Sequence, residues 1–353
     1  MYYVDENIKN TQRVFPDQDR YQYHRYDMNE NPEGLPKEFV DSVLKEITPE
    51  FLSIYPEPDV FTNKYAKFVG AHYDNILTTN GSDMAIRYVL ETFGEKGKDV
   101  VTVAPSFEMY WVNCNILGLK HKPISYNEDL TIDINTIVDA IDDNTRIVVL
   151  LNPNNPVGNV YTTEEVDKVV KKAESVGAVV VIDEAYHYFY DKTFINYALE
   201  KENVIVLRTF SKIFSIAACR IGVVISHPQI IQYLKNARLT FDVNSIALLF
   251  ATRIVENKDL VQHLIDTQKE GKAHVLGELQ KRGYEVRDCK GNFIFIKTNK
   301  EANIVEKELK EKHKILVKSF GNDLLKRYLR VSVGSVQSMD IFLKAFYDVD
   351  LQK

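Results

Sequence analysis

Cysteine is scarce in this chain of 353 residues. The three cysteines, Cys114, Cys219 and Cys289, are odd in number and far apart, so they match neither a disulfide framework nor the close spacing of a metal site. The first residues, "MYYVDENIKN", lack the basic region and apolar core of a secretory signal. These features favour a reducing compartment, and we expect a cytoplasmic location.

Positive charge and long apolar runs are also lacking. The net charge is −6, whereas binding to nucleic acid requires a basic stripe. No apolar segment approaches the length that a helix needs to cross a bilayer. We therefore expect neither nucleic acid nor a membrane among the partners, and we find no internal repeat.

What the chain does contain is typical of a globular α/β protein. Hydrophobic residues make up 45% and charged residues 27%. The chain is longer than a single hydrophobic core usually accommodates, so two domains are expected. From Ile76 onward, continuous apolar runs such as "AVVVI" alternate with amphipathic helix patterns, which predicts a mostly parallel sheet covered by helices on both faces. We place an N-terminal arm joining the small domain at 1–35, a large domain at 36–245 and the small domain at 246–353.

Polar residues follow three successive predicted strands. Asn155, Asp183 and Lys212 are separated by 28 and 29 residues, each about one βα unit. Because the carboxyl ends of parallel strands meet at one edge of a sheet, these side chains should lie close together, where such sheets bind ligands. A lysine amine there can react with an aldehyde, although a single lysine is more often a solvated loop residue.

Asp183 stands directly after four apolar residues. A carboxylate at the end of a buried strand is costly without a partner, so a cation or a proton donor is expected nearby. Helix capping is the alternative role for this residue.

Two further stretches have a structural and a functional interpretation. The turn from Asn80 to Asp83 offers backbone N–H groups at the start of a helix, which suits an anion, but a plain helix cap explains it as well. Phe107 follows another predicted strand, where its ring could stack on a planar ligand or pack in the core.

Together these stretches resemble a known family. The motifs "NENPEG", "YPEPD", "TNGSDMAI", "PSFEMY", "NPNNPVG", "VVIDEAYHYF", "TFSKIFSIAACRIG" and "YLRVSVGS" occur in this order and cover most of the chain. The chain is similar to the class I and II aminotransferases of pyridoxal-phosphate fold type I, and within them to the histidinol-phosphate aminotransferase branch. The resemblance implies a large domain with a mostly parallel sheet of the seven-stranded type, a smaller α+β domain, and pyridoxal 5'-phosphate as cofactor.

The resemblance also implies a role for each motif residue. Lys212 would hold the cofactor and move the proton, and Asp183 would face the pyridine nitrogen. Asn155 and Tyr186 would bond the phenolic oxygen, and Phe107 would stack on the ring. The phosphate would be held by a polar set that includes a tyrosine from the partner subunit of a homodimer: Ser82, Asp83, Thr209, Ser211, Arg220 and Tyr55.

The substrate is less well defined than the cofactor. Arg330 matches the arginine that binds the acidic group of the substrate, and Lys318 stands where the branch has a second arginine. The aromatic residue of the N-terminal arm has three candidates, Phe15, Tyr21 and Tyr23, and "NPVG" replaces the usual "NPTG".

Three functional hypotheses follow. The first is an aminotransferase that uses an amino acid or a histidinol-phosphate-like amino phosphate and a 2-oxo acid such as 2-oxoglutarate, or an aromatic or other amino-acid aminotransferase. The second is a lyase on the same scaffold, similar to threonine-phosphate decarboxylase. The third is a cofactor-binding regulator, for which the segment before the first predicted helix is too short and too weakly basic to be a DNA-binding domain.

Overall fold

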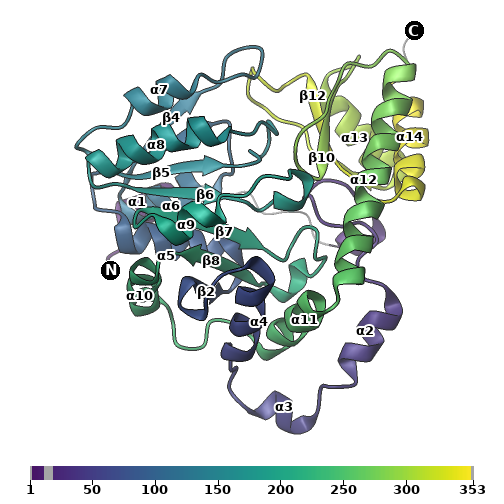
Figure 1. Ribbon diagram of the computed structural model, residues 1–353. Helices are drawn as coiled ribbons and strands as arrows, with labels where there is room; N and C mark the ends of the chain where they lie inside the picture. The colour runs from purple at the N-terminus through teal and green to yellow at the C-terminus, as the bar shows by residue number, and fades with distance from the viewer. Residues whose placement is uncertain (1, 12–18, 351–353) are drawn as a thin grey trace.

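A seven-stranded sheet forms the centre of the larger unit in the computed structural model, which describes residues 2–11 and 19–350 (Figure 1). The strands β3 to β7 run parallel, while β8 is antiparallel to both of its neighbours. The expected mostly parallel sheet is therefore confirmed. In spatial order the strands are β2 (Ile76–Thr79), β8 (Gly222–Ser226), β7 (Val204–Thr209), β6 (Val179–Asp183), β5 (Thr145–Leu151), β3 (Asp99–Ala104) and β4 (Lys120–Ser125).

Helices cover both faces of this sheet. Strands β6, β7 and β8 are buried along their whole length. Their apolar runs predict this burial, except at the carboxyl ends, where Asp183 and Arg208 are buried although they are charged. Thr162 and Glu165 form a capping box at the start of α8, and their spacing of three residues is the sequence pattern typical of one. One face packs against α5 (Gly81–Phe93), α6 (Met109–Leu117) and α10 (Pro228–Ala237), and the other against α4 (Asp59–Val69), α7 (Ile134–Asp139), α8 (Thr163–Ser175), α9 (Ile195–Glu200) and α11 (Ser245–Glu256).

A smaller antiparallel sheet lies beside the large unit, with the long helix α12 leading to it (Figure 1). Its core is filled by helices α12, α13 and α14, and Tyr26 of the N-terminal arm belongs to the same core. This unit contains α12 (Lys258–Lys281), β9 (Val286–Arg287), β10 (Phe293–Lys297), α13 (Ala302–His313), β11 (Ile315–Leu316), β12 (Tyr328–Ser332) and α14 (Val336–Val349).

The N-terminal arm reaches the small unit through a short pairing. Strand β1 (His24–Arg25) runs parallel to β11. Helix α11 packs with the core of the large sheet, whereas α12 continues into the small unit. The domain ranges 1–35, 36–245 and 246–353 stay predictions.

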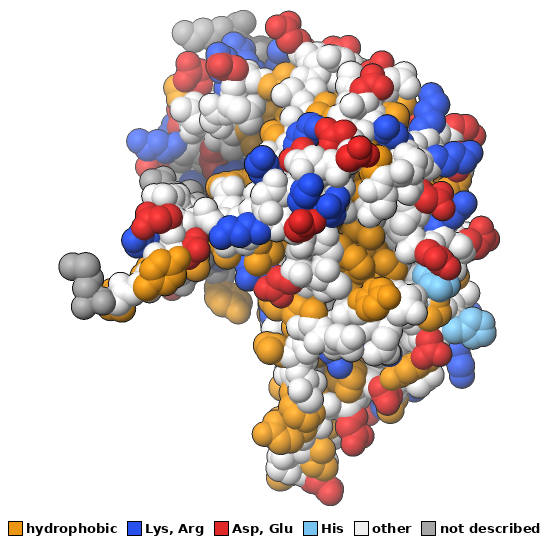
Figure 2. Space-filling model, turned by 90° about the vertical axis from the view of Figure 1, so that its left-hand side faces the viewer, with side chains coloured by type: hydrophobic (Ala, Val, Ile, Leu, Met, Phe, Trp, Pro, Cys, Tyr) orange, Lys and Arg blue, Asp and Glu red, His pale blue; other side chains and the backbone are white. Residues whose placement is uncertain are grey.

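Three short helices lie near the amino end of the chain: α1 (Glu6–Asn10), α2 (Lys37–Leu44) and α3 (Pro49–Ser53). The segment with α3 projects from the body at the bottom of Figure 1. Figure 2 shows hydrophobic side chains gathered on this projection, where Leu52, Ile54 and Tyr55 are exposed. Across residues 2–11 and 19–350, no helix combines the length and the apolar character that a membrane crossing requires.

Candidate active site at the carboxyl ends of the central strands

The central strands of the large sheet end side by side at one edge of the sheet. Leu151, Asp183 and Leu207 are partners in register on the adjacent parallel strands β5, β6 and β7. Asn155 follows the end of β5 after a proline turn, and Lys212 follows the end of β7. The topology therefore brings the three predicted residues to the same edge of the sheet.

Asp183 is buried, and both of its carboxylate oxygens have partners. The Tyr110 hydroxyl donates to Oδ2 at 2.9 Å, and the Ala185 N–H donates to Oδ1 at 3.1 Å. Burial nevertheless raises the pKa of Asp183 to about 6, while the two hydrogen bonds act in the opposite direction. The expected proton donor near Asp183 is confirmed, and it is Tyr110.

Lys212 is half-buried, with its amine turned toward the N-terminal arm. Nζ donates to the Met28 carbonyl at 2.8 Å and lies 5.9 Å from the centre of the Tyr186 ring. Burial, together with the positive charge of Arg330, lowers the pKa of Lys212 to about 8. The pKa of this amine is therefore much closer to neutrality than that of an ordinary lysine.

Tyr186 and Asn155 each accept a hydrogen bond from a neighbour. The Tyr186 hydroxyl accepts from Asn29 Nδ2 at 2.9 Å, and Asn155 Oδ1 accepts from Arg330 Nη1 at 2.6 Å. Since the acceptor atoms are used in this way, the Tyr186 O–H and the Asn155 NH2 remain to donate elsewhere.

Arg330 is a buried cation, with 8% of its surface exposed. Its guanidinium donates to Asn155 and to the Asp27 carbonyl, and Nε finds no hydrogen-bond partner among the residues that the structure describes. In the part of the chain that the structure describes, no carboxylate forms an ion pair with it, and burial lowers its pKa. Lys318 pairs with Arg330 across the strands, so the two side chains leave the same face, but Lys318 is exposed.

A second cluster of polar residues lies at the amino end of α5. Ser82 and Asp83 lie in its first turn, and within the described ranges the side chain of the N-cap residue Asn80 makes no capping hydrogen bond. Arg220 Nη2 contacts the Asp83 carboxylate at 2.9 Å, and Arg220 Nη1 lies 3.5 Å from Ser211 Oγ. Ser211 is held in turn by its N–H, which donates to Thr209 Oγ1 at 3.1 Å.

Other predicted site residues lie apart from these contacts. Tyr55 is 71% exposed and stacks on Phe241, with ring centres 4.3 Å apart. Phe107 is half-buried against the core between the sheet and helices α5 and α6. Among the candidates of the N-terminal arm, Phe15 lies outside the described residues, Tyr21 is 97% exposed and Tyr23 is half-buried.

The sequence interpretation missed several contacting residues. Tyr110 stands three residues after Phe107 in "PSFEMY", near the start of a helix. This position was the signal in the sequence that could have identified it as a site residue. Asn29, Met28 and Asp27 belong to the arm, where "NENPEG" indicated only a turn. No sequence pattern predicts that a segment about 180 residues away contacts Lys212, as it does through Met28.

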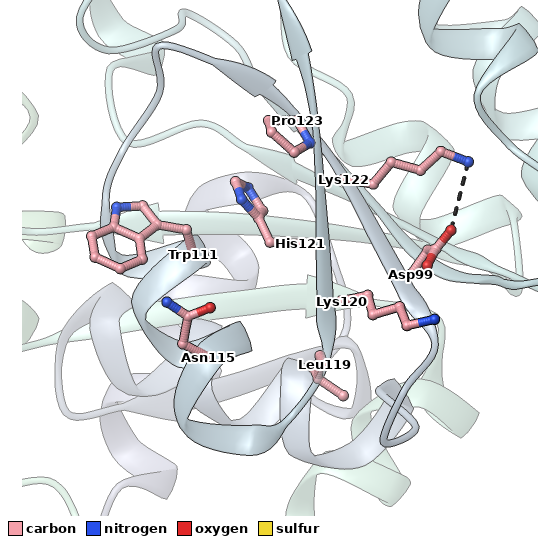
Figure 3. A pocket seen from close by; sticks show the side chains of 8 residues that line it. All are labelled: Asp99, Trp111, Asn115, Leu119, Lys120, His121, Lys122 and Pro123. Atoms are coloured by element: carbon pink, nitrogen blue, oxygen red, sulfur yellow. Dashed lines mark ion pairs between the residues drawn. The ribbon is translucent and has the colours of Figure 1, made fainter. Parts of the chain in front are cut away.

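A hollow of about 730 Å³ lies elsewhere on the large unit (Figure 3). Trp111 of α6 and Lys122 of the edge strand β4 line it, and Asp99 at the start of β3 pairs with Lys122 at 3.5 Å. Because β3 and β4 begin here, this hollow is at the opposite end of the strands from Lys212 and Asp183. It is not part of the candidate site.

Comparisons with known sequences give matches over most of the chain. The model of the family described as "Aminotransferase class I and II" matches residues 27–346. A curated relative from Clostridium novyi (strain NT), named histidinol-phosphate aminotransferase, is 33% identical over 88% of this chain and 87% of its own length. Another of the same name, from Thermoanaerobacter sp. (strain X514), is 32% identical over 98% of both chains.

Solved structures agree with the fold. The histidinol-phosphate aminotransferase from Sinorhizobium meliloti, solved in complex with pyridoxal-5'-phosphate, superposes with a TM-score of 0.89 at 22% identity, and 99% of this chain and 98% of that chain are covered. An aspartate aminotransferase from Thermotoga maritima gives a TM-score of 0.82 at 19% identity over 98% of this chain and 99% of that one. At this level of identity the likeness concerns the fold.

Proposed function

This chain belongs to the class I and II aminotransferases, and from that premise we propose that it uses pyridoxal 5'-phosphate to move an amino group from a histidinol-phosphate-like donor to a 2-oxo acid such as 2-oxoglutarate. The observation that carries the proposal is the presence of two unusual cations beside the carboxyl ends of the central strands: Lys212 follows β7, and Arg330 of β12 contacts Asn155. Lys212 has a pKa lowered to about 8, and the neighbouring Arg330 is buried with neutral partners alone among the described residues.

The start of α5 fits a phosphate group. The N–H groups of the first helical turn have no acceptor within the helix, and in the part of the chain that the structure describes the Asn80 side chain does not cap them. The helix dipole favours an anion there, and Arg220 adds a cation that offsets the Asp83 carboxylate. Gly81 has a φ of 73°, a left-handed conformation that favours glycine, and a Cβ there would lie 2.7 Å from Arg220 Nη2.

The residues at the ends of β5 and β6 fit the ring of the cofactor. When bound, the cofactor supplies an aldehyde for covalent attachment and a ring that takes up the electron pair of the substrate carbon. Asp183 offers a buried carboxylate that can hold a proton at the ring nitrogen. Asn155 and Tyr186 offer an N–H and an O–H to the phenolic oxygen, because their acceptor atoms already serve Arg330 and Asn29.

Lys212 acts as the base and acid of the reaction. With a pKa of about 8, a substantial fraction of this amine is neutral at mildly alkaline pH. A neutral amine can take a proton from the substrate carbon and return it at another atom. The half-buried position of Lys212 limits access of water to that proton.

Arg330 binds the acidic group of the substrate. A buried guanidinium without a carboxylate partner is costly, and an incoming anion offsets that cost. Lys318, on the same face, adds a second cation at the exposed side. Two neighbouring cations favour a phosphate over a single carboxylate, which is why we propose a phosphate-bearing donor.

The active unit is a homodimer that shares its sites. Tyr55 makes its ring contact with Phe241 rather than with the groups at the start of α5, and the segment around it exposes Leu52, Ile54 and Val60. An exposed apolar group of this kind marks a protein interface. A second copy of the chain would cover it and bring Tyr55 to the phosphate of its partner. The cytoplasmic location stays a prediction from the sequence.

A half-reaction screen tests this proposal. The protein is loaded with pyridoxal 5'-phosphate and mixed with single amino donors without a 2-oxo acid, and the loss of the yellow absorbance is followed. Histidinol phosphate should react well, and histidinol, which lacks only the phosphate, should require a far higher concentration. Equal reactivity of the two would contradict the phosphate assignment. Release of carbon dioxide without any need for a 2-oxo acid would replace the aminotransferase by a lyase.

A further inference from the structure

We propose that Asn29 is a positioning residue for Tyr186: its side-chain amide fixes the direction in which the Tyr186 hydroxyl gives its proton. The proposal rests on the proposed function, because the acceptor of that proton is the phenolic oxygen of the bound cofactor. Asn29 lies in the N-terminal arm, 157 residues before Tyr186.

Asn29 belongs to a strap, Asp27–Asn29, that contacts three residues of the candidate site. The Asp27 carbonyl accepts from Arg330, and the Met28 carbonyl accepts from Lys212. The third contact differs in direction, since Asn29 donates to Tyr186. The strap therefore gives acceptors to the two cations and a donor to the tyrosine.

A chain of hydrogen bonds determines which way the Asn29 amide faces. The Asn29 N–H donates to Ser332 Oγ at 2.8 Å, so the Ser332 hydroxyl turns its proton to Asn29 Oδ1 at 3.1 Å. With its oxygen used, Asn29 presents Nδ2 to the Tyr186 hydroxyl at 2.9 Å. Each bond in such a chain strengthens the next, because all donors point the same way.

The Tyr186 hydroxyl keeps its own proton for a hydrogen bond to an acceptor. The residue is 4% exposed, and burial raises its pKa to about 12, so the hydroxyl stays protonated at neutral pH. Within residues 2–11 and 19–350, Asn29 is its hydrogen-bond partner, and this partner occupies the acceptor side of the oxygen. The proton is thus free for an acceptor in the site.

The strand that carries Ser332 also carries Arg330, two residues earlier. Side chains two apart on a strand leave the same face, so one strand supports both the anion-binding arginine and the start of the hydrogen-bond chain. The arm is fixed from a second side as well, because Asn292 Nδ2 donates to the Asn29 carbonyl at 2.9 Å.

The backbone limits what can replace Asn29. Its φ of 58° lies in the left-handed region, which asparagine, aspartate and glycine adopt most easily. Asn29→Asp keeps the shape and the backbone but replaces the donor by an acceptor, so the Tyr186 proton turns away from the site. Asn29→Gly keeps the backbone and removes the amide.

The test follows the visible absorbance of the bound cofactor as the pH is changed, without substrate, and determines the pH at the midpoint of this change. A donor to the phenolic oxygen lowers the proton affinity of the cofactor, so losing it raises the midpoint. We expect Asn29→Asp to raise it by about one pH unit, which is a factor of about ten in proton affinity. Asn31→Asp is the matched control, because Asn31 bonds Gly34 and Ser215 rather than Tyr186, and its midpoint should equal that of the unchanged protein.

A double substitution separates positioning from a general effect of charge. In a Tyr186→Phe background, Asn29→Asp should no longer move the midpoint, whereas an equal shift with and without the hydroxyl would overturn the proposal. If Asn29→Asp does not fold, Asn29→Gly and Ser332→Ala each interrupt the chain and should each raise the midpoint; no shift in either would also overturn it. Failure of the unchanged protein to become yellow with the cofactor would contradict the proposed function instead.

Discussion

Replacing Asp183 by asparagine should stabilise the protein without cofactor while removing most of its activity. Burial raises the pKa of this carboxyl from 3.8 to about 6 in the folded chain. A carboxyl with a raised pKa supports the folded state below its unfolded pKa, and that support is lost as pH rises through the folded value. A shift of about 2 units corresponds to about 3 kcal/mol, so the charged form costs roughly this much at pH 8.

The neutral amide in Asp183→Asn avoids that cost. The variant should therefore exceed the unchanged protein in free energy of unfolding at pH 8 by up to about 3 kcal/mol, with the excess shrinking toward pH 4. Urea unfolding of both cofactor-free proteins at pH 4.5, 6 and 8 measures the difference. The assay is done without cofactor, because a protonated ring nitrogen would pair with the carboxylate and hide its cost.

Activity should change in the opposite direction. Loss of a preorganised charge partner typically lowers the rate by about 10²–10³, and we expect a loss of this size with the cofactor bound. A stability difference that does not vary with pH would refute the reasoning, since it would mean that Asp183 bears no ionisation cost. Near-normal turnover would show that the carboxylate has no role in the reaction.

Three further predictions concern the other residues of the site. Lys212→Ala should fold but lose turnover and the cofactor label that borohydride fixes on the protein; a label on another lysine, found by peptide mapping, would contradict the assignment. Mixing inactive Tyr55→Ala with inactive Lys212→Ala should restore part of the activity, because some mixed dimers hold one intact site, whereas full activity as a monomer would exclude shared sites. Arg330→Ala and Lys318→Ala should each raise the KM for histidinol phosphate, each losing roughly 1.5–3 kcal/mol of binding free energy. Lys318→Ala should leave the KM for histidinol unchanged. If Lys318→Ala does not change the KM for histidinol phosphate, this lysine does not bind the phosphate.

The sequence by itself determined the architecture of the large sheet and the edge at which three candidate site residues meet. Uninterrupted apolar runs such as residues 179–182 predicted a buried parallel sheet, since a strand covered on both faces has no polar side. Regular spacing then placed Asn155, Asp183 and Lys212 at one sheet edge, because each βα unit has a similar length. The capping box at α8 was also readable, as its two residues are only three apart. These features depend on local pattern and on topology.

The tertiary structure decided the partners of those residues. Tyr110 as the donor to Asp183, Asn29 as the donor to Tyr186 and the Met28 carbonyl as the acceptor for Lys212 come from segments far away in the chain. Such contacts depend on how helix α6 and the arm pack against the strand ends, and no periodicity records that packing. The pKa values also depend on tertiary structure. Burial raises the pKa of Asp183 to about 6 and lowers that of Lys212 to about 8, and burial is a property of the assembled fold rather than of the residue.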